Sequence, residues 1–454
     1  MGIAESVARL EFLGHAGYVV ERGPLYLVVD PWLDGTAFNN GWDPLVPAAR
    51  FDVRRVTHLW FSHEHPDHFS IPAVKSIPPE RRAGLTVLFQ ETADKRVVNF
   101  LRGNGYGRVL EVAPGQRQEL GGGAVLTTVT ARDGDSCHLL EVGGVRLLNF
   151  NDCFYNSVAE VEDAMRALGV KAGEVDLLAT QFSYANWVGN PGEQERRRQA
   201  ARRKLEHLAM QARTVRPRFV MPFASFVYFS HEENVYLNDA VNLPSTAVAR
   251  VREEGFSPVM LRPGDTLELS PAGLQAAAEA TEARARELDG SVEAVRRGEK
   301  PLRKSAPVPL EDVVATVRDG LERLRNGASR LDRALMRLRL PRVVFELRDH
   351  RALIVIQLLE HVRVAPLGTT AADVVLSSEA LRFAFTQDFG FDTLLVNGRF
   401  HEARLGGADA VTTLCGQFGY VRRKVSLAAS FLRRRLVEAP RLTLERLRNR
   451  ALAP

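Results

Sequence analysis

Short apolar runs, separated by Gly, Pro and Asp, dominate the first 150 residues of the chain. They read R-L-E-F-L, Y-L-V-V-D, H-L-W-F-S, L-T-V-L-F, A-V-L-T-T-V-T, H-L-L-E-V and R-L-L-N-F. Runs of this length that are rich in β-branched and aromatic residues and bounded by turn residues are typical of strands. The pattern therefore predicts that this part of the chain is built on β-sheet.

Helical patterns alternate with these runs. We expect helices after Pro72, around Thr92 to Arg102, from Ala159 to Leu168 and from Glu193 to Val215. Strands mixed with crossing helices pack as layers, and loops at one sheet edge collect polar residues. We therefore expect an α/β fold of the αββα type for a catalytic domain that spans residues 1–270.

The composition changes near residue 271, where Ala, Glu and Arg dominate. We interpret residues 271–307 as a helical linker and residues 308–454 as a smaller C-terminal α+β domain. The arginine-rich pattern from Lys424 to Arg450 predicts a basic helical tail, which we interpret as a solvated face, with a membrane-surface or partner helix as the alternative. The domain covers a pocket or mediates a homodimer, and the sequence favours neither.

Composition and charge exclude several classes of function. The net charge is +5, but no Lys/Arg patch is interleaved with aromatic residues, so we expect no nucleic-acid partner. The cysteines are Cys137, Cys153 and Cys415, which lack C-x-x-C spacing and predict neither a disulfide framework nor a cysteine metal site. Neither a signal peptide nor an apolar run of roughly 18 residues is present, so we expect a cytoplasmic protein without an integral membrane segment.

The chemistry concentrates in L-W-F-S-H-E-H-P-D-H-F-S, residues 59–70. Alternation along an extended segment places His63 and His65 on one side, and the turn after Pro66 brings Asp67 and His68 to a second position. Imidazoles and carboxylates suit zinc or iron. The sequence therefore predicts two neighbouring metal ions directly after a buried strand.

The order of three segments resembles the metallo-β-lactamase superfamily: E-F-L-G-H-A-G-Y-V-V, Y-L-V-V-D-P-W-L-D-G and H-x-H-x-D-H. The resemblance implies an αββα sandwich with a metal site at its edge. It also implies that Asp30 supports a ligand histidine by fixing its tautomer, with turn capping as the alternative. His15 in L-G-H-A falls near the pocket of similar proteins, with a structural role as the alternative, and we do not predict it as a ligand.

The remaining ligands follow from the same resemblance. Asp152, at the end of V-G-G-V-R-L-L-N-F-N-D-C, takes the bridging position, and a buried aspartate there would be costly without a cation. The usual histidine is missing from T-V-T-A-R-D-G-D-S-C, where Asp133 falls in its place, with Asp135 as the rival and a turn role for Asp133 left open. For the last ligand we predict His231, with Glu232 as the alternative.

A carboxylate in place of an imidazole shifts the metal preference from zinc toward iron or manganese. Longer segments, including G-D-S-C-H-L-L-E-V-G-G-V-R-L-L-N-F-N-D-C and R-P-R-F-V-M-P-F-A-S-F-V-Y-F-S-H, resemble the catalytic part of the CMP-N-acetylneuraminate hydroxylase family. This resemblance implies a diiron oxygenase that uses O2 as co-substrate to hydroxylate a small polar molecule.

The same family carries a Rieske domain with C-x-H and C-x-x-H ligand pairs, and neither pair occurs here. We therefore expect a separate iron–sulfur or flavin electron donor. The competing interpretation is a dizinc hydrolase that acts on a phosphodiester, lactone, amide or thioester. A purely structural role for the metals is disfavoured, because structural zinc sites are closed and four-coordinate. The substrate is left open.

Overall fold

The computed structural model describes residues 7–132 and 134–423. The chain forms two compact units, Met1–Arg303 and Lys304–Pro454. The predicted basic tail from Lys424 onward and the predicted ligand Asp133 lie outside the described residues.

Two seven-stranded sheets form the first unit. The strands of the first sheet, in spatial order, are β16 (Thr266–Glu268), β1 (Arg9–Gly14), β2 (Gly17–Arg22), β3 (Leu25–Val29), β5 (His58–Phe61), β6 (Thr86–Gln90) and β7 (Arg108–Val112). Those of the second sheet are β15 (Ser257–Pro258), β13 (Phe219–Phe223), β12 (Leu177–Gln181), β11 (Val145–Asn151), β10 (Ser136–Val142), β9 (Ala124–Thr130) and β8 (Arg117–Gly121). All seven predicted strands are present, in β1, β3, β5, β6, β9, β10 and β11.

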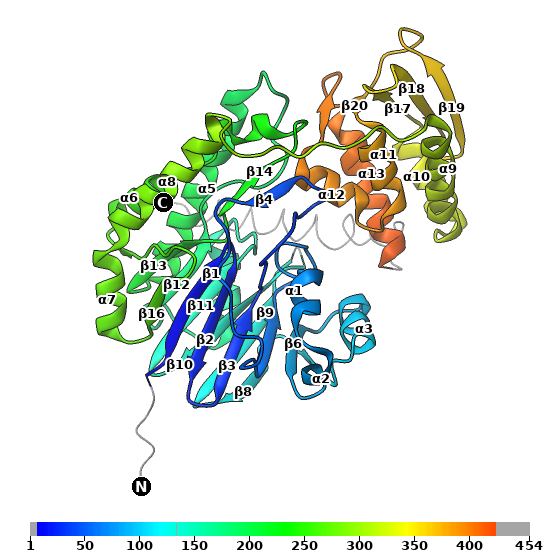
Figure 1. Ribbon diagram of the computed structural model, residues 1–454. Helices are drawn as coiled ribbons and strands as arrows, with labels where there is room; N and C mark the ends of the chain where they lie inside the picture. The colour runs from blue at the N-terminus through cyan, green and yellow to red at the C-terminus, as the bar shows by residue number, and fades with distance from the viewer. Residues whose placement is uncertain (1–6, 133, 424–454) are drawn as a thin grey trace, which may run out of the picture. The chain divides into compact units, whose positions relative to one another are not determined.

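Alternation along β5 shows how the layers are joined. Leu59 and Phe61 pack in a cluster with helices α1 (Ile71–Ser76) and α3 (Arg96–Gly103). Trp60 faces the other way, into a core shared with residues of both sheets. Helices α4 (Val158–Leu168), α5 (Gln194–Val215) and α6 (Pro244–Glu253) contribute to that second cluster. Figure 1 shows α1, α2 (Pro79–Arg82) and α3 on one side of the sheets and α5 and α6 on the other, which confirms the αββα arrangement.

Strand direction brings several loops to one edge. Strands β3, β5 and β6 are parallel, and the β1–β2–β3 meander makes β1 run the same way. The loop after β1, the turn after β3 and the loop after β5 therefore lie at the same edge of the first sheet. In the second sheet β11, β12 and β13 are parallel, while β10 runs antiparallel to β11, so the start of β10 lies beside the end of β11.

The segment expected to be a linker differs from the structure. Helices α7 (Pro271–Glu279) and α8 (Thr281–Arg296) pack on the first unit, where Leu274, Leu288 and Val292 are buried in its core cluster. Many residues of these helices are Glu or Arg that are at least partly exposed, so the sequence resembled that of a solvated linker. Only about one residue per turn is apolar and buried. In the sequence, the boundary between the two units falls after Arg303.

The remaining elements of the first unit are short. They are the two-stranded sheet of β14 (Val227–Phe229) and β4 (Trp42–Pro44), and the 3-10 helix η1 (Val235–Ala240).

The second unit has a five-stranded sheet in the order β19 (His361–Pro366), β18 (Ala352–Gln357), β17 (Arg342–Leu347), β20 (Val374–Leu376) and β21 (Phe400–Glu402). Its helices are α9 (Leu310–Asn326), α10 (Arg330–Arg339), α11 (Ser378–Thr386), α12 (Gly390–Asn397) and α13 (Ala408–Arg422). This unit mixes helices and strands, in agreement with the α+β class expected from the sequence. Among the described residues, no helix combines the length and apolarity that crossing a membrane requires.

Candidate metal centre

Histidines and carboxylates converge where the loops of both sheets meet. The loop after β5 carries His63, His65, Asp67 and His68, and neighbouring loops supply the other members. Three groups of described residues could hold a metal ion: His15, Asp67 and His68; His63, His68 and Asp152; and His63, His65 and Asp135. Within each group the ligand atoms lie within 4.8 Å of one another. Because His63 and His68 are each shared by two groups, the groups form one continuous cluster that could hold two ions.

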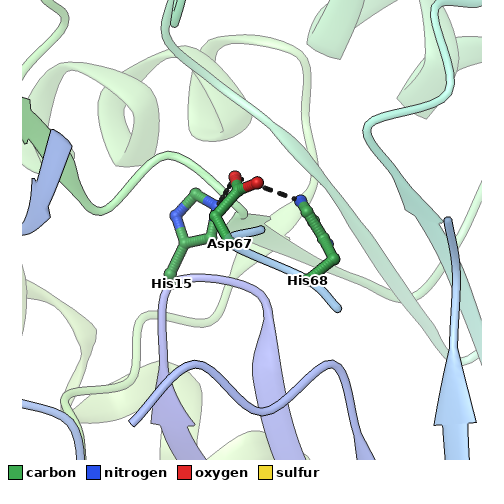
Figure 2. A group of neighbouring side chains, drawn as sticks. All are labelled: His15, Asp67 and His68. Carbon is green, nitrogen blue, oxygen red and sulfur yellow. Dashed lines mark hydrogen bonds and ion pairs between the residues drawn. The ribbon is translucent and has the colours of Figure 1, made fainter. Parts of the chain in front are cut away.

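The first group is sealed from solvent. Figure 2 shows Asp67 between His15 and His68. His15 Nε2 lies 3.0 Å from Asp67 Oδ2, and His68 Nε2 lies 3.4 Å from the same oxygen. The side chain of His15 is 3% exposed, that of Asp67 is 1% exposed and that of His68 is 0% exposed. We call these three residues the buried half of the centre.

The group at the other end of the cluster is partly open. His63 Nε2 lies 2.9 Å from His65 Nδ1 and 3.7 Å from Asp135 Oδ1. The His63 side chain is 2% exposed, whereas that of Asp135 is 18% exposed. We call His63, His65 and Asp135 the open half. Asp152 connects the halves, because its Oδ2 lies 3.3 Å from His68 Nε2 and the residue also groups with His63.

Asp30 fixes the tautomer of His68. This buried carboxylate lies at the end of β3 and accepts hydrogen bonds from Ser62 N, Ser62 Oγ and Asn151 Nδ2. Its Oδ2 also lies 3.0 Å from His68 Nδ1, which must therefore carry the proton. The lone pair of a neutral His68 then resides on Nε2, which faces the carboxylates of Asp67 and Asp152.

Ser62 orients His63 in the same way. The Ser62 hydroxyl donates its single hydrogen to Asp30 Oδ2 at 2.7 Å, so at 2.9 Å its oxygen accepts the hydrogen of His63 Nδ1. The lone pair of His63 is then on Nε2, toward His65 and Asp135. One buried carboxylate thus orients two imidazoles, which is how proteins hold metal-ligating histidines.

Neighbouring groups shift the pKa values of several residues of the centre. Although burial disfavours the charged form, the carboxylates of Asp152 and Asp67 raise the pKa of His68 well above its usual value. Burial likewise opposes ionisation of Asp152, yet the His68 ring lowers the pKa of Asp152 to about 2. Burial lowers the pKa of His63, and the neighbouring rings of His68 and His65 lower it further, so that it is well below its usual value.

Unsatisfied buried atoms show that a cation fits this cluster. Asp67 Oδ1 and His68 Nε2 are buried without a hydrogen-bond partner. A buried polar atom left without a partner costs free energy, and buried carboxylates are usually paired or bound to metal. The donor set of imidazole nitrogens and carboxylate oxygens suits first-row divalent metals.

Of the residues predicted from the sequence, the structure brings together His63, His65, Asp67, His68 and Asp152, and it places Asp30 against His68. Asp135, the rival carboxylate, is in the open half.

His231 is in none of the groups found among the described residues. It follows β14, which belongs to a separate two-stranded sheet. Its Nδ1 accepts the backbone N–H of Glu233. The alternative, Glu232, is also outside the groups.

His15 is the residue that the sequence interpretation missed as a candidate ligand. It adopts a left-handed backbone with φ of 45° in the turn between β1 and β2. Residues other than glycine rarely adopt this conformation, and it often marks a functional site. The sequence held a signal for His15: three consecutive strands that form a meander place the loop after the first strand, which carries His15, at the same sheet edge as Asp30.

Comparison with known proteins agrees with the resemblance seen in the sequence. The cytidine monophosphate-N-acetylneuraminic acid hydroxylase of Cricetulus griseus is 27% identical over 287 residues, covering 59% of this chain and 49% of that protein. The Mus musculus protein of the same name is 27% identical over 252 residues, covering 52% of this chain and 42% of that protein. The chain thus spans about half the length of these relatives. No family model matches it.

Among solved structures, CmlA, a diiron beta-hydroxylase from Streptomyces venezuelae, is 20% identical, with a TM-score of 0.39 and coverage of 58% of this chain and 54% of that one. With its two sheets, outer helices and ligand cluster at one edge, the chain has an αββα fold, and over 59% of its length it is similar in sequence to a cytidine monophosphate-N-acetylneuraminic acid hydroxylase.

Proposed function

We propose that this chain is a dinuclear-metal oxygenase, with iron the favoured metal, that hydroxylates a small polar substrate. The observation that carries the proposal is the third member of the open half, where the carboxylate of Asp135 groups with His63 and His65. A hard oxygen donor at this position shifts the preference from zinc toward iron. The similarity to hydroxylases supports the same reaction class.

Asp67, His68 and His15 would hold one ion, His63, His65 and Asp135 the other, and Asp152 would serve both. When bound, two iron ions would supply the redox chemistry that activates dioxygen. The overall reaction consumes the substrate, O2, two electrons and two protons, and yields the hydroxylated product and water. We propose that a separate iron–sulfur or flavin protein supplies the electrons.

The chain's own residues prepare the ligand geometry. Asp30 holds Nδ1 of His68 protonated, and Ser62 does the same for His63, so that the lone pair of each ring is on Nε2, the atom that would bind metal. Substrate would approach the open half, where Asp135 is 18% exposed, beside the connecting residue Asp152, which is 19% exposed. Such preorganised ligands reduce the rearrangement that the site undergoes on metal binding.

A dizinc hydrolase is the second candidate. It is favoured by the four imidazoles in the cluster, those of His15, His63, His65 and His68, since imidazole suits zinc as well as iron. In that case the same residues would hold two zinc ions that lower the pKa of a shared water toward 7.

Metal analysis separates the two candidates. Protein prepared without oxygen in iron-supplemented medium is examined by elemental analysis and Mössbauer spectroscopy. We expect about two irons per chain with an exchange-coupled spectrum. Two zinc ions, with iron excluded even when it is offered, would contradict the oxygenase and favour the hydrolase.

A further inference from the structure

We infer that Gln181 and Lys204 form a polar relay that positions Asp152, so that this carboxylate presents a single oxygen to the metal cluster. Gln181 is the last residue of β12, and Lys204 lies on α5. This inference rests on the proposed metal centre and adds to it two positioning residues that are outside the three ligand groups.

The relay is continuous over three side chains. Lys204 Nζ donates to Gln181 Oε1 at 2.7 Å, and Gln181 Nε2 donates to Asp152 Oδ1 at 2.7 Å. The other carboxylate oxygen, Oδ2, lies 3.3 Å from His68 Nε2. The two oxygens of Asp152 thus have different partners: Oδ1 binds the relay, and Oδ2 faces the histidines.

Hydrogen-bond chemistry gives the relay one direction. A lysine ammonium only donates, and an ionised carboxylate only accepts. A glutamine amide between them must turn its oxygen to the lysine and its NH2 to the carboxylate. The flipped amide would place two donors together at the lysine and two acceptors together at the carboxylate. Lys204 therefore fixes the orientation of the Gln181 amide, and the amide in turn fixes the orientation of the Asp152 carboxylate.

The surroundings hold Lys204 in place. Its side chain is half-buried, and Nζ lies 5.5 Å from the ring centroid of Phe154, within the range of a cation–π contact. Phe154 is two residues beyond Asp152, so the lysine contacts the same loop twice, once through Gln181 and once through this ring. The positive charge also offsets part of the negative charge that three carboxylates bring to the cluster.

The matched control is Arg203, the neighbour of Lys204 on α5, whose side chain is exposed. The variant Arg203→Met removes one positive charge from the same helix and leaves the relay intact. Lys204→Met removes the charge and the donor while keeping an unbranched side chain. Lys204→Arg keeps both, and Gln181→Leu breaks the relay at its centre.

The experiment titrates metal-free protein with Fe2+ under nitrogen, and separately with Zn2+, against a coloured chelator. For Gln181→Leu we expect affinity for the second ion to fall about 10–100-fold, the usual effect of removing a group that orients a ligand. For Lys204→Met we expect about a 10-fold loss, whereas Lys204→Arg should restore binding to within about threefold. Arg203→Met should bind both ions like the wild type.

A spectrum provides a readout that a merely structural role would not change. In Co2+-loaded protein, a carboxylate that serves both ions couples their spins, so we expect Gln181→Leu and Lys204→Met to lose coupling in EPR spectra while circular dichroism shows an unchanged fold. If Gln181→Leu misfolds, Lys204→Met still tests the relay from the surface of α5.

Two results would overturn the relay but leave the metal centre standing. One is wild-type metal affinity and spin coupling in Lys204→Met. The other is an equal loss of metal affinity in Arg203→Met, which would show that only the net charge of the helix matters. A wild-type protein that binds neither Fe2+ nor Zn2+ would overturn the metal centre itself, and the relay with it.

Discussion

The two halves of the candidate metal centre are made of the same residue types but differ in their surroundings. In the buried half, His15, Asp67 and His68 are at most 3% exposed and include atoms without hydrogen-bond partners. In the open half, Asp135 is 18% exposed and can exchange its contacts with water. A carboxylate that is shielded from water needs a bound cation to offset the cost of burying its charge, whereas water stabilises a carboxylate that it can reach. The comparison indicates that the buried half depends more strongly on a bound cation than the open half does.

The largest effect is expected at Asp152, because this residue connects the halves. Asp152→Ala should remove both ions, since each loses a ligand and their mutual repulsion is no longer offset. Elemental analysis should show metal falling from about two ions per chain to near zero. Asp163→Ala, at an exposed aspartate on α4, is the matched control and should retain both ions. Two ions in Asp152→Ala would refute the connecting role.

Asp30→Asn should impair the buried half most strongly. The asparagine NH2 would face donors that now bond to the carboxylate, and an unsatisfied buried donor costs on the order of 1–3 kcal/mol. His68 would lose the partner that fixes its tautomer, and metal affinity should fall about 10–100-fold. Metal titration together with thermal unfolding measures both effects. A variant with wild-type affinity would show that Asp30 only stabilises the turn.

Asp135→Ala should empty the open half and leave the buried half loaded. We expect about one ion per chain, with little loss of thermal stability because the side chain is partly solvated. The neighbouring variant Asp133→Ala decides between the two rival carboxylates. Loss of metal in Asp133→Ala but not in Asp135→Ala would restore the assignment that the sequence favoured.

A paired comparison of His15→Ala and His231→Ala tests the last ligand. Since His15 Nε2 lies 3.0 Å from Asp67 Oδ2 while His231 is outside the groups, we expect only His15→Ala to weaken metal binding, by about 10-fold. Chelator competition under identical conditions provides the measurement. The reverse order would return His231 to the ligand set and leave His15 a structural histidine.

The smallest expected effect is on the pH dependence of the metal-free protein. The raised pKa of His68 means that its stabilising contribution is complete below about pH 6.5 and is lost as the pH rises through the folded-state pKa. The pKa of Asp152, lowered to about 2, means that its contribution is present above about pH 3.9 and is lost as the pH falls toward 2. Thermal unfolding of chelated protein should therefore show greatest stability between these limits. Added metal should remove the loss at high pH, because the metal and the proton compete for His68 Nε2.

Much of the fold was predictable because its strands are short, apolar and well separated by turn residues. Helices α7 and α8 were harder to assign, since most of their surface is charged and only a narrow apolar stripe, with Leu288 and Val292, is buried. A stripe of that width resembles a solvated helix until its packing partner is known.

The sequence by itself determined the compact part of the centre. His63, His65, Asp67 and His68 lie within six residues of one another, so local geometry alone holds them close, and the family resemblance pointed to Asp152 at the end of a strand. Only the tertiary structure decided the members that come from distant strands. His15 joins the centre because the meander makes β1 parallel to β3. Asp135 groups with His63 because the start of β10 lies against the end of β5, where Ser136 Oγ donates to Ser62 O. The Gln181–Lys204 relay likewise requires β12 and α5 to be side by side. The physical reason is that a single sequence encodes contacts a few residues apart through backbone geometry, whereas contacts between residues far apart in the sequence depend on how strands and helices are arranged in space.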